Sequence, residues 1–285
     1  MSGKVTEHID RRTTWMGQWW RHALLMPLSF LTLYPVLWVV KMAVTPSSAF
    51  ELSANPIPTT LSAENFTALL SQGLFWRQLW NSILVSGATT VVGIVLSCTA
   101  AYAFSRFDFP GRKAGMNALL VTQMFPGVIM AIPLYILMDV AGLLNSLTGL
   151  TLCYATTAIP FCVWMLKGYF DTIPRELEEA AVLDGASRWM VFTRIILPLS
   201  KPAIAVTALF SFMTAWNEFI LAATFMSKET AFTLPVALQA FVGDRSTDWG
   251  LFAAGAVIVS VPVMALFFAL QKQLVEGLTA GSVKG

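Results

Sequence analysis

The sequence of 285 residues is 56% hydrophobic and only 12% charged, and its mean hydropathy is +0.67. This composition excludes an ordinary soluble domain and predicts an all-α protein with several membrane-spanning helices. The formal net charge of +2 is too small to indicate binding to nucleic acid, so we expect membrane lipid rather than DNA or RNA around the chain.

The first 22 residues are polar and basic, and their tryptophans suit the headgroup layer of a membrane. We interpret residues 1–22 as an amphipathic lead-in on the cytoplasmic side. A signal peptide is the alternative. The apolar run at 23–40 is long enough to cross a bilayer, however, and is predicted to remain as the first membrane helix. Pro27 and Pro35 are expected to kink this helix.

Six apolar stretches are each long enough to cross a bilayer, and they are predicted to form a six-helix membrane domain over residues 23–274. They are residues 23–40, 82–104, 114–138, 147–166, 203–225 and 251–270. The second is rich in glycine, alanine, serine and threonine, which in lipid mark faces where helices pack closely. The third is interrupted by Pro126 and Pro133, so it is either a kinked packing helix or part of the wall of a translocation path. Gln123, Phe125 and Pro126 are the candidates for that path.

The fifth stretch contains the sequence Trp216-Asn217-Glu218. An ionisable side chain at this depth is costly, so Glu218 should face the inside of the helix bundle rather than lipid. A hydrogen bond to a neighbouring helix and a contact with a transported solute both remain open for this carboxylate. Trp216, Asn217 and Glu218 are therefore further candidates for the translocation path.

The basic residues predict how the helices are oriented. Fourteen of the 18 lysines and arginines fall in the two terminal segments and in two loops, at 106–113 and 167–201. The remaining four lie in the connections on the opposite side. Because lysine and arginine concentrate in cytoplasmic loops, both termini and the 167–201 region are expected to face the cell interior.

No residue pattern in the sequence indicates a catalytic, disulfide or metal site. Cys98, Cys153 and Cys162 fall inside apolar stretches without C-x-x-C spacing, and His8 and His22 stand apart from each other. A membrane enzyme would need a cluster of histidine, cysteine or carboxylate side chains at membrane depth. We therefore expect a protein without enzymatic activity, and without a metal or cofactor of its own.

Residues 171–200 form the most charged internal segment, and they are predicted to be a loop of two short helices. Thr172 is expected to cap the first helix, with Pro174 at its first position. Acidic residues follow in the first turn, where they favour the positive end of the helix dipole. Gly185 should end this helix, because glycine enters the left-handed conformation without steric cost.

The second helix of this loop should be capped by Ser187, cover residues 188–197 and be closed by Pro198. On the first helix, Ala180 and Ala181 belong to a shallow apolar face of small side chains. Such a face lets another surface approach closely. The alternative is an amphipathic helix that only lies on the lipid headgroups.

The same loop contains the pattern E-A-A, three residues, G, nine residues, I, one residue and L-P, running from Glu179 to Pro198. This pattern resembles the EAA loop of permease subunits of bacterial ATP-binding-cassette (ABC) importers. Residues 123–126, 167–170 and 277–285 resemble the carbohydrate branch of that family. Within the branch the likeness is greatest to the second permease of maltose/maltodextrin importers, and trehalose or another di- or oligosaccharide is the alternative substrate.

The resemblance implies the transmembrane domain of a type I importer in the bacterial inner membrane, together with a set of partners. These would be a second, different permease chain, two copies of an ATPase subunit, and a periplasmic or extracellular sugar-binding protein. The sequence contains no G-x-x-x-x-G-K-[ST] motif to hold nucleotide phosphates. ATP and Mg²⁺ would therefore bind to the ATPase partner and not to this chain.

The resemblance also assigns roles to particular residues. The first loop helix would dock into a cleft of the ATPase through Glu179, Ala180, Ala181, Leu183 and Gly185. Residues 241–249 would be an outer loop near the binding protein, with the candidate contacts Gly243, Asp244, Arg245, Asp248 and Trp249. Residues 275–285 would be a cytoplasmic tail, either extended along the ATPase subunits or disordered.

A secondary transporter is the alternative class of function. Such proteins usually place several ionisable residues or paired broken helices near the membrane midplane to couple transport to an ion. Here only Glu218, inside the fifth predicted span, and Asp139, at the end of the third, intrude. The sequence therefore favours transport driven by a separate ATPase.

Overall fold

The computed structural model describes residues 19–46, 54–242 and 247–282, and within these ranges it forms helices and no β-strand. The predicted all-α class is confirmed. The chain divides into two compact units. The first is Met1–Leu69 with Asp244–Val257, and the second is Leu70–Gly243 with Ile258–Gly285.

The first unit contains α2 (Trp19–Val44), α3 (Glu64–Leu70) and the opening turns of α14 (Trp249–Ser282). Helix α2 includes the predicted first span and runs through both of its prolines. Its first turn takes up the last four residues of the predicted lead-in, and residues 1–18 lie outside the described part of the chain. The buried Lys41 donates to the carbonyl of Asn55 at 3.0 Å, which fixes the C-terminal end of α2 to the segment that follows.

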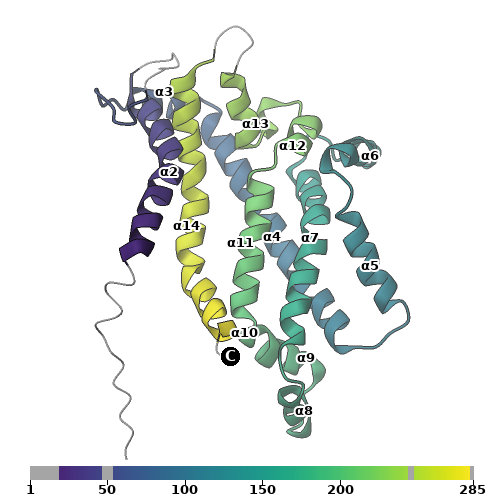
Figure 1. Ribbon diagram of the computed structural model, residues 1–285. Coiled ribbons are helices and arrows are strands. Elements are labelled where there is room, and N and C mark those ends of the chain that lie inside the picture. The colour runs from purple at the N-terminus through teal and green to yellow at the C-terminus, as the bar shows by residue number, and fades with distance from the viewer. Residues whose placement is uncertain (1–18, 47–53, 243–246, 283–285) are drawn as a thin grey trace, which may run out of the picture. The chain divides into compact units, whose positions relative to one another are not determined.

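The second unit is built around three long helices, α4 (Phe75–Arg106), α7 (Leu147–Asp171) and α11 (Lys201–Trp216), which lie side by side (Figure 1). The other elements are α5 (Arg112–Thr122), α6 (Gly127–Val140), α8 (Glu176–Leu183), α9 (Arg188–Val191), the π-helix η1 (Phe192–Ile196), α10 (Leu197–Leu199), α12 (Ile220–Phe225), the 3₁₀-helix η2 (Glu229–Ala231), α13 (Leu234–Leu238) and the 3₁₀-helix η3 (Gln239–Phe241). Helices α8 and α9 lie at one end of this unit, and α6, α12 and α13 lie at the other (Figure 1).

Small side chains bring α4 close to its two neighbours, as the composition of the second predicted span indicated. Ser86, Thr89, Gly93 and Ser97 are buried along one side of α4. Ser97 donates to the carbonyl of Ile159 in α7 at 3.4 Å. A Cβ atom on Gly93 would lie only 3.4 Å from the hydroxyl oxygen of a serine in α11. Close approach of backbones at small residues is what stabilises helix pairs in lipid, where apolar burial supplies little driving force.

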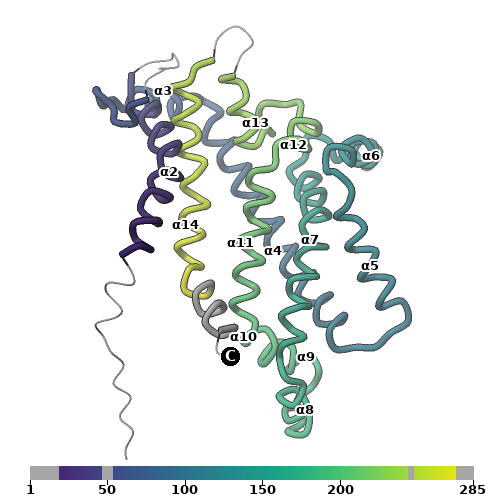
Figure 2. Tube along the Cα trace, in the orientation of Figure 1, coloured from purple at the N-terminus to yellow at the C-terminus, as the bar shows by residue number. Residues whose placement is uncertain are grey.

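Two pairs of neighbouring helices are sharply bent in the structure. Helices α5 and α6 are bent by 104° at a break between Thr122 and Gly127, and Figure 2 shows the chain turning there. The interruption predicted from Pro126 is therefore confirmed. A second pair, Arg188–Leu199 and Lys201–Trp216, is bent by 77°. Within the described ranges, four helices are long and apolar enough to cross a membrane, and six is the count when each bent pair is one span.

The prediction of one continuous helix over residues 203–225 was wrong. Helix α11 ends at Trp216 and α12 begins at Ile220. The reason is local, because the Glu218 carboxylate accepts hydrogen bonds from the backbone N–H groups of Leu221 and Ala222, at 2.9 and 3.2 Å. These are donors in the first turn of a new helix, which have no partner within the helix itself.

Helix α14 is longer than predicted, since it continues beyond the predicted end at residue 270 as far as Ser282. Most of the segment 275–285 was expected to be extended or disordered, and its residues 275–282 are instead helical. The stretch 271–276 (QKQLVE) is rich in good helix formers, which favour continuing the helix.

The close approach of α4 and α11 can be tested with two glycines of the same helix. Gly93→Leu is expected to overpack the contact and to destabilise the chain by about 1–3 kcal/mol. The measurement is the thermal unfolding midpoint in detergent. Gly87→Leu is the matched control, because a Cβ at Gly87 meets no atom within 4 Å. Equal midpoints for the two variants would contradict a tight contact at Gly93.

Candidate functional site

The candidate site is the loop between α7 and α11, at the end of the second unit where α4 also ends. Helix α8 begins at Glu176, so the prediction that Thr172 caps it was wrong. Helix α7 extends to Asp171, and the Thr172 hydroxyl donates to the carbonyl of Tyr169 at 2.7 Å, within the last turn of α7. The acidic residues predicted for the first turn of α8 do lie there, where they favour the positive end of its dipole.

The end of α8 is fixed by Gly185, as predicted. Its φ of 89° lies in the left-handed region. The N–H of Ala186 donates to the carbonyl of Ala181 at 2.9 Å, and the N–H of Gly185 donates to the carbonyl of Val182 at 3.0 Å. This pair of bonds is a Schellman motif, which satisfies carbonyls that would otherwise lack partners at a helix end. A side chain at position 185 would strain this turn.

The second half of the loop starts as predicted and ends differently. The Ser187 hydroxyl accepts from the N–H of Met190 at 3.2 Å and caps α9. The predicted stop at Pro198 was wrong, because the π-helix η1 leads into α10 and the chain bends only at Ser200. A wider π turn just before Pro198 removes the clash that its ring would have with a regular α-helical turn.

The proposed docking residues form the exposed part of α8 and its C-terminal turn. Glu179, Ala180 and Gly185 are exposed, and Ala181 is half-buried. Leu183 is 88% exposed, and Leu177 and Val182 on the same helix are 46% and 42% exposed. Exposed apolar groups of this kind commonly mark a surface that another protein covers.

The sequence interpretation missed how α8 is attached to the rest of the unit. Glu178 is buried beside Glu179, and its carboxylate pairs with the guanidinium of Arg106 at the end of α4. The hydroxyl of Tyr102 donates to the same carboxylate at 3.1 Å. Adjacent residues of a helix point about 100° apart, so only one of two neighbouring glutamates can face the protein. The sequence alone did not indicate which one.

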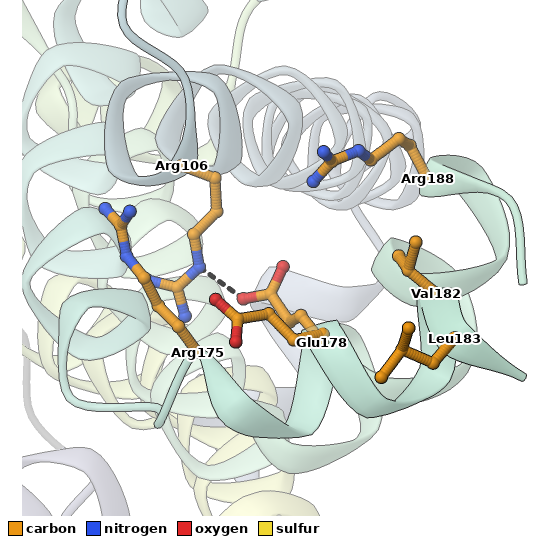
Figure 3. Close-up of a pocket in the computed structure, with 7 residues that line it drawn as sticks. Arg106, Arg175, Glu178, Val182, Leu183 and Arg188 are labelled. Carbon is orange, nitrogen blue, oxygen red and sulfur yellow. Dashed lines mark hydrogen bonds and ion pairs between the residues drawn. The ribbon is translucent and has the colours of Figure 1, made fainter.

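A pocket of about 490 Å³ opens between α8, α9 and the end of α4 (Figure 3). Its lining carries three guanidinium groups, two carboxylates and two apolar side chains, which are Arg106, Arg175, Glu178, Glu179, Val182, Leu183 and Arg188. Arg106 points at Glu178, with Arg175 beside it and Arg188 on the far side of the pocket (Figure 3). The guanidinium of Arg188 also lies over the ring of Phe107, 5.9 Å from its centroid. Arg175, Glu179 and Arg188 are exposed, so the accessible part of the lining carries both charge signs.

The path candidates of the third predicted span lie at the break between α5 and α6. Gln123 is exposed and its side-chain amide donates to the carbonyl of Thr157 in α7 at 3.2 Å. Pro126 caps α6, where its missing N–H leaves no donor unpaired within the helix, and Phe125 is 57% exposed. Their role in a translocation path stays a prediction.

The candidates of the fifth predicted span have structural partners. Trp216 is buried, its ring stacks on Phe212 at 5.5 Å, and its Nε1 donates to the carbonyl of Val259 at 3.1 Å. Asn217 is exposed and donates to the carbonyl of Met213 at 2.9 Å. Glu218 caps α12, as described above. These contacts account for the three residues without a solute, and their place in a path stays a prediction.

The outer-loop candidates are only partly described. Gly243, Asp244 and Arg245 lie outside the described residues. Asp248 accepts a hydrogen bond from the N–H of Leu251 at 3.0 Å and caps α14, which begins at Trp249. Among the described residues, no group of three or more histidine, cysteine, aspartate or glutamate side chains could hold a metal ion.

Sequence comparisons place this loop inside a known family model. The model described as "Binding-protein-dependent transport system inner membrane component" matches residues 93–279. The chain is 36% identical to the trehalose transport system permease protein SugB of Mycobacterium tuberculosis, over 89% of this chain and 93% of that protein. It is 34% identical to the diacetylchitobiose uptake system permease protein DasC of Streptomyces coelicolor, over 94% and 98%. It is 41% identical to the maltose/maltodextrin transport system permease protein MalG of Salmonella typhimurium, over 74% and 73%.

Solved structures show the same fold. The structure of a bacterial ABC transporter involved in the import of the acidic polysaccharide alginate matches with a TM-score of 0.77 and 23% identity, over 94% of this chain and 99% of that chain. A second structure, the alginate transporter in complex with an alginate pentasaccharide-bound periplasmic protein, matches with a TM-score of 0.67 and 18% identity, over 90% and 93%.

The capping role of Glu218 can be tested without any partner. Glu218→Leu leaves the N–H groups of Leu221 and Ala222 without an acceptor and is expected to cost about 1–3 kcal/mol of unfolding free energy. Glu218→Gln keeps one acceptor oxygen and should fall between the leucine variant and the native chain. The thermal unfolding midpoint in detergent measures both. A leucine variant as stable as the native chain would contradict the capping role.

Proposed function

The chain belongs to the family of binding-protein-dependent transport system inner membrane components and has the fold of an ABC importer transmembrane domain, and on this basis we propose that it is the permease subunit of an ATP-driven sugar importer. The observation that carries the proposal is the α8 segment. An ordered helix with an E-A-A-x₃-G pattern exposes Glu179, Ala180 and Leu183 next to a charged pocket, which suits docking of another protein.

The partner at α8 is proposed to be an ATPase subunit. The sequence has no P-loop of its own, so ATP and Mg²⁺ bind to the partner and this chain is not the catalyst. A tilt of the ATPase between its nucleotide-bound and nucleotide-free forms moves α8, and the helices on either side then open the path alternately to the two faces of the membrane. Two ATPase copies and a second, different permease chain complete the proposed complex.

The substrate is proposed to be maltose or a maltodextrin, and trehalose is the second candidate. The maltose/maltodextrin relative has the higher identity, while the trehalose relative is matched over more of the chain. A sugar-binding protein delivers the substrate at the end of the second unit opposite to α8. In this proposal the chain lies in the bacterial inner membrane, with both termini and α8 on the cytoplasmic side.

Reconstitution tests the proposal directly. The chain is assembled in liposomes with its ATPase, the second permease and the binding protein, and ATP hydrolysis is measured with maltose, maltotriose and trehalose in turn. Stimulation by one sugar, together with crosslinking from Ala181→Cys to the ATPase, is the expected result. Uptake that continues without the ATPase would favour a secondary transporter instead.

The left-handed turn at Gly185 provides a second test. Gly185→Val strains the Schellman turn and shifts the exposed face of α8, so we expect normal insertion into the membrane but at least a tenfold loss of sugar uptake. Gly111→Val is the matched control, because Gly111 also has a left-handed φ of 86° with open space around it, but lies outside the α8 loop. Normal uptake with Gly185→Val would contradict the docking role of α8.

A further inference from the structure

The feature that the proposed function leaves unused is the buried charge pair between α4 and α8. The side chains of Arg106 and Glu178 are only 5% and 7% exposed, although both lie next to an open, charged pocket. Arg106 also donates to the carbonyl of Ile173 at 3.0 Å, and Tyr102 donates to Glu178. The last turn of α4 therefore holds both α8 itself and the segment that leads into it.

A second set of contacts holds the end of α7 to the same turn. The hydroxyl of Ser105 donates to the carboxylate of Asp171 at 2.6 Å, and Arg175 donates to the carbonyl of Ser105 at 3.4 Å. The ring of Tyr102 packs against Phe192 in η1, with centroids 4.8 Å apart. An apolar cluster that includes Tyr102, Ile173 and Phe192 packs beside the polar pair, so the end of α7, α8 and η1 all contact the last turn of α4.

Helix α4 is suited to carry movement away from this point. It has 32 residues, and of the four described helices that are each long enough to span a membrane it alone has no proline inside. At 1.5 Å per residue it is about 48 Å long. Near its other end, Asn81 donates to the carbonyls of Thr230 and Phe232, at 3.1 and 2.9 Å, and the Ser82 hydroxyl accepts from the N–H of Leu234 at 2.7 Å.

We propose that Arg106 and Glu178 form a latch that makes α4 move with α8, so that displacement of the docking helix reaches the 229–234 segment at the far end of the unit. Glu178 is then a positioning residue for coupling, with a role different from that of its neighbour Glu179 in docking. A buried ion pair suits this task, because removing one partner leaves an uncompensated charge and the pair therefore holds one geometry. Coupling between two distant sites requires a structural element whose position both sites influence, and α4 has contacts at both of its ends.

The inference rests on the proposed function. Variants of the two adjacent glutamates test the latch and the docking role separately. In the reconstituted complex, Glu178→Gln is expected to leave co-purification of the ATPase unchanged and to lower the amount of sugar transported per ATP hydrolysed at least fivefold. Glu179→Gln is expected to weaken co-purification of the ATPase. Failure of the Glu179 expectation alone counts against the docking assignment and leaves the latch standing.

Two results with Glu178→Gln would overturn the latch. One is a normal amount of sugar transported per ATP. The other is a loss of ATPase co-purification as large as that caused by Glu179→Gln, because Glu178 would then act in docking and not in transmission.

A measurement on the complex with Arg106 and Glu178 intact keeps the latch testable if the glutamine variant does not accumulate. Nitroxide labels are placed on Asp108→Cys, just beyond α4, and on Asp184→Cys, at the end of α8; both positions are exposed. The three native cysteines are buried. The distance between the labels is expected to be the same in the ATP-bound and nucleotide-free complexes. A distance that changes with nucleotide would show that α4 and α8 move separately and would overturn the latch.

Discussion

The second unit depends on how closely α4 can approach α7 and α11. Small side chains and one glycine line the buried side of α4, and they let α7 and α11 pack closely against it. Lipid offers no advantage to burying larger apolar groups, so backbone proximity and hydrogen bonds have to stabilise the bundle. The same helix ends beside the loop that carries α8. Its position therefore decides where the exposed face of α8 is presented.

The loop itself could be predicted well from the sequence because its signals are local. Gly185 and Ser187 act on backbone groups one to four residues away, and the structure shows both in the expected roles. The start of α8 was misplaced because Thr172 has two helix ends within reach, and α7 takes it. The attachment of α8 could not be predicted, since Arg106 and Glu178 are 72 residues apart and only tertiary structure brings them together.

The membrane-spanning helices likewise include features that the sequence predicted and features that it did not. Apolar length located every long helix, and Pro126 indicated the break between α5 and α6. The break after Trp216 was missed because Glu218 was considered only as a buried charge that needs a partner outside its own helix. Its carboxylate accepts hydrogen bonds from the backbone N–H groups of Leu221 and Ala222, which are close in sequence. The helical course of residues 275–282 was missed because the small residues there were given more weight than the good helix formers before them. A single sequence contains no direct information on which of two competing local interactions wins.

Leu183 has a consequence for the life of the chain before assembly. Its side chain is 88% exposed at the C-terminal end of α8, next to the left-handed turn at Gly185. A copy made in excess of its partners displays this leucine to water, and exposed apolar side chains are what chaperones and proteases bind. If α8 docks as proposed, the leucine that the partner covers also exposes an unassembled chain to removal, which would keep the number of chains matched to the number of complexes.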